Sequence, residues 1–330
     1  MRYLAGYLAS VREKMGDELT DIHIELDLED GVLLGHILSA VDDVSDYIPK
    51  VYDSSFTLYA CADDDYIVDA ADISAFTAGS TCTIAQTTLT PARNVTVKFT
   101  DADNSITAFT LTVVGKDIRG TAQTEVFTWA NGLVQEGEML FSYITSVTAT
   151  AITGNSTADT LDIGFGKWVH KGLSLPSVGV TTFLDLLTCR DNYGQEYFKD
   201  LVGIQAIEYP VTTDTSGRPN YRNVSLNGTI ADISYTSALE ATYSIRVLWS
   251  GKHKLTFDSS TIPAYLEDAV ILGAMAHAFS ALGSRKIDMV NIGGAVPSQL
   301  RDIGLIKKEE FEKKLKGKKP VKILKSYTTE

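Results

Sequence analysis

The middle of the chain alternates polar and apolar residues, whereas both ends repeat apolar residues at helical spacing. Five Thr- and Val-rich segments alternate in this way: 94–100, 106–114, 122–129, 139–151 and 159–165. Turn-forming residues separate these segments, and no helical period lies between them. Short strands at this spacing are typical of an antiparallel sandwich or barrel. The pattern therefore predicts a β domain over residues 80–168.

The N-terminal end predicts two helices. Apolar residues recur every three or four positions from Leu4 to Met15, and we expect this helix to end at Gly16. A second helix is expected from about 28 to 47, with Asp27 as its N-cap.

Helices return near the C-terminal end, after three more expected strands: 203–211, 221–235 and 241–249. Pro263 suits the first turn of a helix over 264–282, which we expect to end at Gly283. A short helix after Pro297 and a Lys-rich amphipathic helix over 305–316 are expected to follow. Small residues form a ridge on the first of these helices that would let a neighbouring helix approach closely: Ala269, Gly273, Ala276 and Ser280.

We therefore expect an α+β fold. Its N- and C-terminal helices would form a discontinuous helical-bundle frame, with a β hairpin or sheet region and an inserted antiparallel β-sandwich. The expected parts are N-terminal frame helices at 1–55, a connecting β segment at 56–79, the inserted sandwich at 80–168, a linker with a short helix at 169–202, a β region of the frame at 203–260, C-terminal helices at 261–304 and a basic C-terminal arm at 305–330.

Charge is distributed unevenly along the chain. The net charge of −13 argues against nucleic acid as an affinity partner, because binding to DNA depends on basic residues that displace counterions from phosphates. Residues 307–330 hold nine Lys and four Glu, a net +5, so residues 1–306 carry −18. The basic end either docks on an acidic neighbour or is a solvated helix face with a frayed terminus. Its lysines are Lys307, Lys308, Lys313, Lys314, Lys316, Lys318, Lys319, Lys322 and Lys325.

The sequence predicts no catalytic, cofactor or metal site. The common catalytic and nucleotide-binding motifs are absent, and His277 in an apolar helix is typical of a packed core or interface histidine. Asp101, Asp103 and Ser105 have the spacing that opens a calcium loop, but the later glycine and glutamate are missing, so a hairpin turn is the better interpretation. The acidic run 63–65 is contiguous, so its carboxylates should not converge on one face of a strand.

Cysteine usage and hydropathy suggest a protein made in the cytoplasm. Cys61, Cys82 and Cys189 have no metal-ligand spacing and are expected to stay reduced. Residues 3–11 are too short and too soon followed by charge for a secretory signal. No apolar run is expected to reach the roughly 20 residues needed to span a bilayer, so no membrane association is expected.

Several segments occur in an order that is familiar from one class of viral protein. They are LTDIHIELDLEDGVLLGHILSAVDDVSDYIPK at 19–50, IQAIEYP at 204–210, and later IRVLWSGKHKLTF and TIPAYLEDAVILGAMAHAFSAL. The first resembles the opening helices of head–tail adaptor (connector) proteins of tailed bacteriophages, and the others are similar to the C-terminal half of that family. Compact adaptors lack so large an insertion between these halves.

The inserted region has a likeness of its own. PARNVTV at 91–97, VVGKDIRGTAQTEVFTW at 113–129, LFSYITSVTA at 140–149 and IGFGKWVHKGLSLPS at 163–177 follow one another. Together they resemble the immunoglobulin-like β-sandwich that recurs in phage head and tail proteins.

The adaptor resemblance implies a structural virion protein of the neck, not an enzyme. Adaptors form a ring, usually of twelve copies, that docks under the portal protein and extends the DNA channel. The ring also presents a surface to the tail, stopper or tail-terminator protein. DNA would pass through without sequence-specific binding, and an acidic lumen would repel it. A C-terminal arm would reach the portal, and the Lys-rich segment 307–325 matches it in position.

Two other classes of function remain open. The sandwich could belong to a decoration protein or a host- or glycan-binding module, which would require Trp129 and Trp168 to be exposed platforms rather than core or hinge residues. A neck-associated hydrolase would require His170, His253 and nearby carboxylates to cluster.

Overall fold

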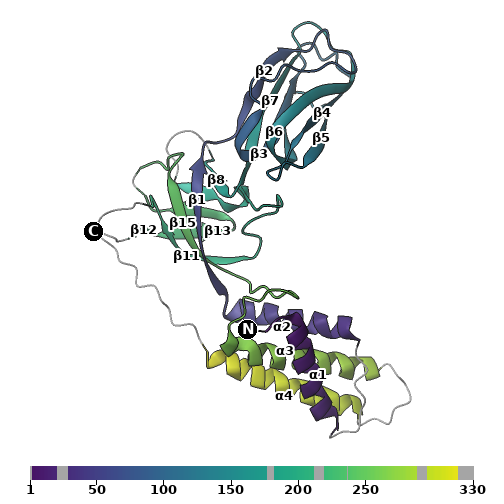
Figure 1. Cartoon of the computed structure of the whole chain (residues 1–330), viewed down its shortest axis with the longest axis vertical. Helices are drawn as coiled ribbons and strands as arrows, with labels where there is room; N and C mark the ends of the chain where they lie inside the picture. Colours follow the sequence, from purple (N-terminus) through teal and green to yellow (C-terminus); the bar gives the residue numbers. More distant parts are fainter. Residues whose placement is uncertain are drawn as a thin grey trace. The chain divides into compact units, whose positions relative to one another are not determined.

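The computed structural model describes residues 2–20, 29–176, 182–211, 219–235, 237–287 and 296–318. Helices make up 27% and strands 42%, so the fold is mixed α+β, as predicted. The chain divides into two units (Figure 1). The helical unit comprises Met1–Tyr52, Asp200–Gln205 and Trp249–Glu330, and the β unit comprises Asp53–Lys199 and Ala206–Leu248.

The helical unit combines helices from both ends of the chain: α1 (Leu4–Thr20), α2 (Asp30–Tyr47), α3 (Ala264–Ile287) and α4 (Val296–Lys316). α3 contacts α2, α4 and α1, and α1 also contacts α2 (Figure 1). Their apolar faces meet in one core that includes Tyr7, Ile37 and Phe279, all fully buried. Helices from residues far apart in the sequence therefore share a single hydrophobic core.

Two predicted helix ends are wrong. α1 continues past Gly16 to Thr20, and α3 continues past Gly283 to Ile287. A Cβ added at Gly283 would lie 3.3 Å from the backbone N of Arg301 on α4. This glycine therefore permits close packing of two helices and does not end one.

Other helix predictions also need correction. The two helices expected after Pro297 and over 305–316 are one continuous helix, α4, with Pro297 in its first turn. Glu29 is the N-cap residue of α2 and its side chain makes no capping hydrogen bond. The predicted cap, Asp27, lies outside the described residues.

α3 is long and apolar enough, by length and composition, to cross a membrane over Ala264–Ser284. The expectation that no run would qualify is therefore wrong. Two thirds of this stretch is buried inside the protein, against the other helices, which is typical of a core helix.

A seven-stranded sheet fills much of the β unit: β2 (Asp63–Asp72), β3 (Thr88–Thr100), β4 (Ala108–Lys116), β5 (Ala122–Thr128), β6 (Val134–Thr153), β7 (Thr160–His170) and β10 (Cys189–Arg190). Its order is β10-β7-β3-β6-β4-β5, and β2 also pairs with β7. β3 to β7 are the five predicted strands. β2 and β10 extend the sheet beyond the expected 80–168 on both sides.

Long strand β6 organises this sheet. It pairs with β3 up to Tyr143 and with β4 from Tyr143 onward, antiparallel in both cases. The strands enclose one apolar cluster around the fully buried Phe99 and Phe141. β4 and β5 form a regular hairpin from Thr110↔Thr128 to Lys116↔Ala122.

Two smaller sheets complete the fold. A five-stranded sheet has the order β12-β11-β15-β1-β8, and a three-stranded one has the order β13-β14-β9. The strands are β1 (Lys50–Tyr59), β8 (Gly172–Ser174), β9 (Phe183–Asp185), β11 (Leu201–Glu208), β12 (Tyr221–Arg222), β13 (Val224–Asn227), β14 (Ile230–Ile233) and β15 (Ser244–Gly251). A 3-10 turn, η1 (Leu186–Thr188), follows β9.

Candidate functional site

The Lys-rich segment begins as part of a packed helix. Lys307 lies 2.6 Å from Glu18 of α1, and Lys314 lies 3.1 Å from Asp268 of α3. The predicted arm over 305–330 is therefore wrong for its first part, because residues up to 316 belong to α4.

The remaining lysines of this segment differ in their surroundings. Lys316 lies 3.8 Å from Glu312 on the same helix, and Lys318 lies 5.6 Å from the ring centre of Tyr265. Lys308 and Lys313 are exposed and form no ion pair within the described part of the chain. Lys319, Lys322 and Lys325 lie outside the described residues.

Lys307 is the best anchored of these lysines. Its side chain is only 15% exposed. Burial opposes the charged form, but the hydrogen bond and charge of Glu18 outweigh it and raise the pKa of Lys307. This ammonium therefore ties α4 to α1 and is poorly placed to meet another molecule.

The predicted ridge of small residues faces neighbouring helices. A Cβ added at Gly273 would lie 3.0 Å from Ala40 of α2 and 3.2 Å from Phe311 of α4. A Cβ added at Gly304 of α4 would lie 2.9 Å from the hydroxyl of Ser280. Ala269 and Ala276, the other two members, are buried.

A groove of about 440 Å³ lies over this ridge. Its lining includes Asp43 of α2, His277 of α3 and Lys308 and Glu312 of α4. Nε2 of His277 lies 2.8 Å from the carboxylate of Asp43. Both charge signs occur in the groove, so it offers polar contacts to a partner without favouring one sign.

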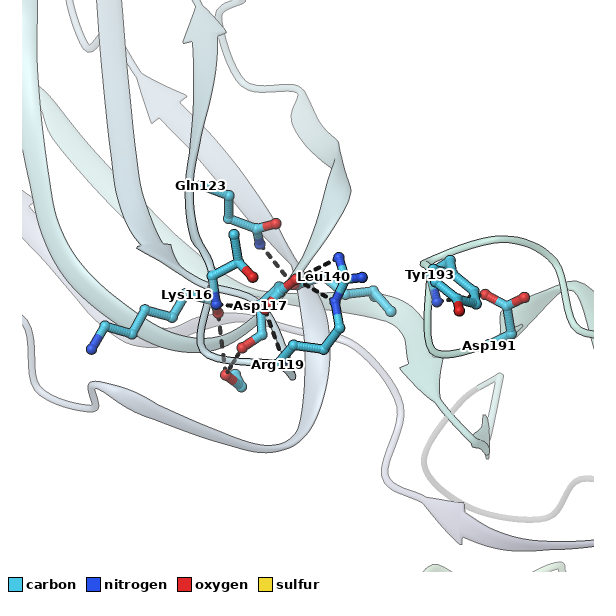
Figure 2. Close-up of polar contacts among 9 residues, drawn as sticks. Lys116, Asp117, Arg119, Gln123, Leu140, Asp191 and Tyr193 are labelled. Atoms are coloured by element: carbon cyan, nitrogen blue, oxygen red, sulfur yellow. Dashed lines mark hydrogen bonds and ion pairs between the residues drawn. The ribbon is translucent and has the colours of Figure 1, made fainter.

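A second hollow lies on the β unit, at the turn between β4 and β5 (Figure 2). Asp117 organises this turn, because its Oδ1 accepts the backbone N–H of Arg119 and of Thr121, each at 2.8 Å. The N–H of Gly120, which has φ +80°, donates to the Asp117 carbonyl. Oδ2 of Asp117 also accepts two N–H groups of the Arg119 guanidinium at 3.1 Å.

The turn over residues 191–195 is built in the same way. Oδ1 of Asp191 accepts the backbone N–H of Tyr193 at 2.8 Å and of Gln195 at 3.0 Å. The N–H of Gly194, with φ +75°, donates to the Asp191 carbonyl. In both turns the N–H of the aspartate also donates to the carbonyl four residues later.

These two turns, 117–121 and 191–195, line one hollow of about 240 Å³ that we call the two-turn cleft. Each turn contributes one member of a cation–aromatic pair, and the Arg119 guanidinium lies 5.5 Å from the ring centre of Tyr193 (Figure 2). The remaining lining residues are Gln123, Glu138, Met139 and Leu140. No predicted site residue lies in this cleft, although both turns share the sequence pattern Asp-x-(Arg/Tyr)-Gly.

The acidic run at 63–65 departs from prediction. One carboxylate oxygen from each of Asp63, Asp64 and Asp65 lies within 4.8 Å of the others, and the pairing of β2 with β7 is irregular between Asp63 and Val68. A hydrogen bond with Asp65 and burial raise the pKa of Asp63. Lys98 lies 3.8 Å from Asp64.

The second acidic cluster holds a turn together. Oδ2 of Asp101 accepts the backbone N–H of Ile106 at 2.9 Å, and Asp159 accepts that of Ala102 at 2.9 Å. The segment joins β3 to β4 but is not a hairpin, because β6 lies between these strands in the sheet. The carboxylates of Asp101, Asp103 and Asp159 lie within 4.8 Å of one another.

The tryptophans named for glycan binding are not exposed platforms. Trp129 is half-buried against the apolar cluster of the seven-stranded sheet, 5.8 Å from Phe99 between ring centres. Trp168 is half-buried, with the Arg190 guanidinium 4.0 Å from its ring centre.

The histidines named for catalysis contact no carboxylate within the described ranges. Nε2 of His170 lies 3.0 Å from Oδ1 of Asn192. His253 is buried, its ring nitrogens lie 3.1 and 3.0 Å from the carbonyls of Thr261 and Ile48, and burial lowers its pKa.

The three cysteines are free, as predicted. Burial raises the pKa of Cys82 to about 11 and that of Cys189 to about 12. Both thiols therefore stay protonated at neutral pH, which makes them poor nucleophiles and poor metal ligands.

Comparison with known proteins gives no relative. No family model, no curated protein and no solved structure matches this chain.

Proposed function

We propose that this chain is a structural virion protein, a head–tail adaptor that forms a ring under the portal and joins the DNA channel to the tail or stopper. The observation that carries the proposal is the helical unit built from both ends of the chain. A frame closed by its terminal helices, with strands between them, is what the adaptor resemblance implies.

The finer architecture belongs to the same proposal. α1 to α4 would be the adaptor frame, and the seven-stranded sheet would be the inserted immunoglobulin-like sandwich. The single apolar cluster enclosed by this sheet supports the second assignment.

We assign contact with the portal to exposed lysines of α4 that do not form ion pairs with other helices in the described part of this protein. Lys307 and Lys314 pair with Glu18 and Asp268, so they hold α4 in place. Lys308 and Lys313 are exposed and can meet acidic groups of another protein.

Assembly tests the proposal directly. The full-length protein is sized by light scattering and native mass spectrometry, alone and mixed with the portal protein of the same virus. We expect a cyclic oligomer, or a monomer that assembles on the portal. A monomer indifferent to the portal would contradict the adaptor function.

A pair of charge reversals tests the lysine assignment. Lys308→Glu with Lys313→Glu should weaken portal binding by about tenfold or more, because rim charges set association rate and specificity. The matched control reverses two exposed lysines of the β unit, Lys116 and Lys199. Equal loss in both double variants would show that net charge, and not this face of α4, governs binding.

A further inference from the structure

The proposed adaptor function assigns no role to the two-turn cleft, and the chemistry of the cleft suits a small ligand. We propose that it binds a neutral saccharide, with Tyr193 as the aromatic surface and the surrounding amides and carboxylates as hydrogen-bonding partners.

Tyr193 is the first reason. The residue is 74% exposed, the highest exposure among the large hydrophobic residues that the structure describes. Its backbone is nevertheless fixed, because Asp191 holds the turn on which it lies. A tyrosine presented in this way offers a rigid amphipathic surface at low cost in conformational entropy.

The polar groups of the cleft are the second reason. Nε2 of Gln123 donates to the Leu140 carbonyl at 2.7 Å, which fixes the amide and leaves its Oε1 as an acceptor. Asn192 is oriented by His170, and the exposed side chains of Gln195 and Glu138 add further donors and acceptors. The two oriented amides, those of Gln123 and Asn192, match neighbouring hydroxyls, which both donate and accept hydrogen bonds.

Charge narrows the class of ligand. Asp117 already neutralises Arg119, while the carboxylates of Glu138 and Asp191 remain in the cleft. Their negative charge disfavours phosphate, sulfate and acidic sugars. The volume of about 240 Å³ falls below the roughly 300–1,000 Å³ of pockets that enclose drug-sized ligands, so a ligand the size of one sugar ring would fit.

Ligand-observed NMR by saturation transfer on the full-length protein tests the proposal. The panel contains neutral hexoses, N-acetylhexosamines, their disaccharides and longer oligomers of the same units, with sialyllactose, a heparin disaccharide and trilysine as charged comparators. We expect saturation transfer to at least one neutral sugar, and titration calorimetry then gives its affinity. Tighter binding of oligomers would identify a polysaccharide as the source of the ligand.

Variants locate the site. Tyr193→Ala should weaken binding of that sugar by about tenfold, as loss of an aromatic anchor does, whereas Tyr193→Phe should retain most of it. Tyr265→Ala removes another exposed tyrosine, in the helical unit, and should change nothing. Because Tyr193 is exposed, its alanine variant should keep the parent melting temperature.

Three outcomes would overturn the proposal: no transfer to any neutral sugar, tighter binding of a charged comparator, or binding that survives Tyr193→Ala. None of these bears on ring formation, which is measured separately by sizing the same variants.

Discussion

In the helical unit, carboxylates pair with basic side chains from other parts of the unit, whereas in the β unit many of them hold backbone N–H groups of nearby turns. Glu18 and Asp268 meet Lys307 and Lys314. On the β unit, by contrast, these carboxylates accept backbone N–H groups: Asp72, Asp101, Asp103, Asp117, Asp159, Asp185 and Asp191.

The difference follows from where each kind of element leaves backbone groups unpaired. Helices satisfy their N–H groups internally except in the first turn, so their carboxylates remain available for long-range ion pairs. A chain of strands has a turn every ten residues or so, and short acidic side chains supply the missing acceptors. Part of the large negative charge of this protein is therefore structural and does not act on partners.

The largest expected effect tests the turn acceptors. Asp101 is 7% exposed and its carboxylate accepts the backbone N–H of Asp103, Ser105 and Ile106. Asp101→Ala leaves the N–H of the buried Ile106 without its acceptor and removes one acceptor each from Asp103 and Ser105, so it should lower the free energy of unfolding by about 3 kcal/mol. Denaturant unfolding followed by tryptophan fluorescence measures it. The exposed Asp103→Ala is the control, and an equal loss there would refute the role given to Asp101.

A smaller effect is expected for the interhelical pairs. Lys307→Met keeps the aliphatic stem but removes the charge facing Glu18, and should cost about 1–2 kcal/mol. Denaturant unfolding followed by far-ultraviolet circular dichroism, which reports on the helices, measures this loss. Lys313→Met, on the exposed face of the same helix, is the control, and its free energy of unfolding should stay within about 0.5 kcal/mol of that of the parent.

The stability difference between the parent protein and Lys307→Met should depend on pH in a definite direction. The pKa of Lys307 is raised in the folded protein. The contribution of the Lys307 charge to the free energy of unfolding should be complete below the unfolded pKa of about 10.4. It should disappear as the pH rises through the pKa of Lys307 in the folded protein. A difference between parent and Lys307→Met that persists at higher pH would mean that packing, and not charge, is responsible.

The smallest effect concerns the Asp117 turn. Although burial opposes ionisation, hydrogen bonds from Thr121 and Arg119 lower the pKa of Asp117. The parent should be more stable than Asp117→Asn, and this stability difference should be complete above the unfolded pKa of about 3.9. It should decrease as the pH falls through the pKa of Asp117 in the folded protein. Melting temperatures of both proteins, measured over this pH range, check the prediction. A difference in melting temperature that does not change with pH would exclude the Asp117 charge as its source.

Much of the fold follows from local patterns in the sequence. β3 to β7 were predicted because alternation along a strand depends only on which face is buried. The helix ends at Gly16 and Gly283 were predicted wrongly, because a glycine inside a helix weakens it but does not by itself end it. Gly283 lies against α4, and no local signal reveals that neighbour.

The sequence by itself determined most element types, the acidic body and the basic end, but not the strands β8, β9 and β10 within the expected linker 169–202. Only the tertiary structure decided which charges are already used, since Lys307 and Glu18 are almost three hundred residues apart and meet through helix packing. It likewise brought the turns at 117–121 and 191–195 to one cleft. Their shared pattern is visible in the sequence, but the facing of Arg119 and Tyr193 depends on long-range strand pairing, which local periodicity does not encode.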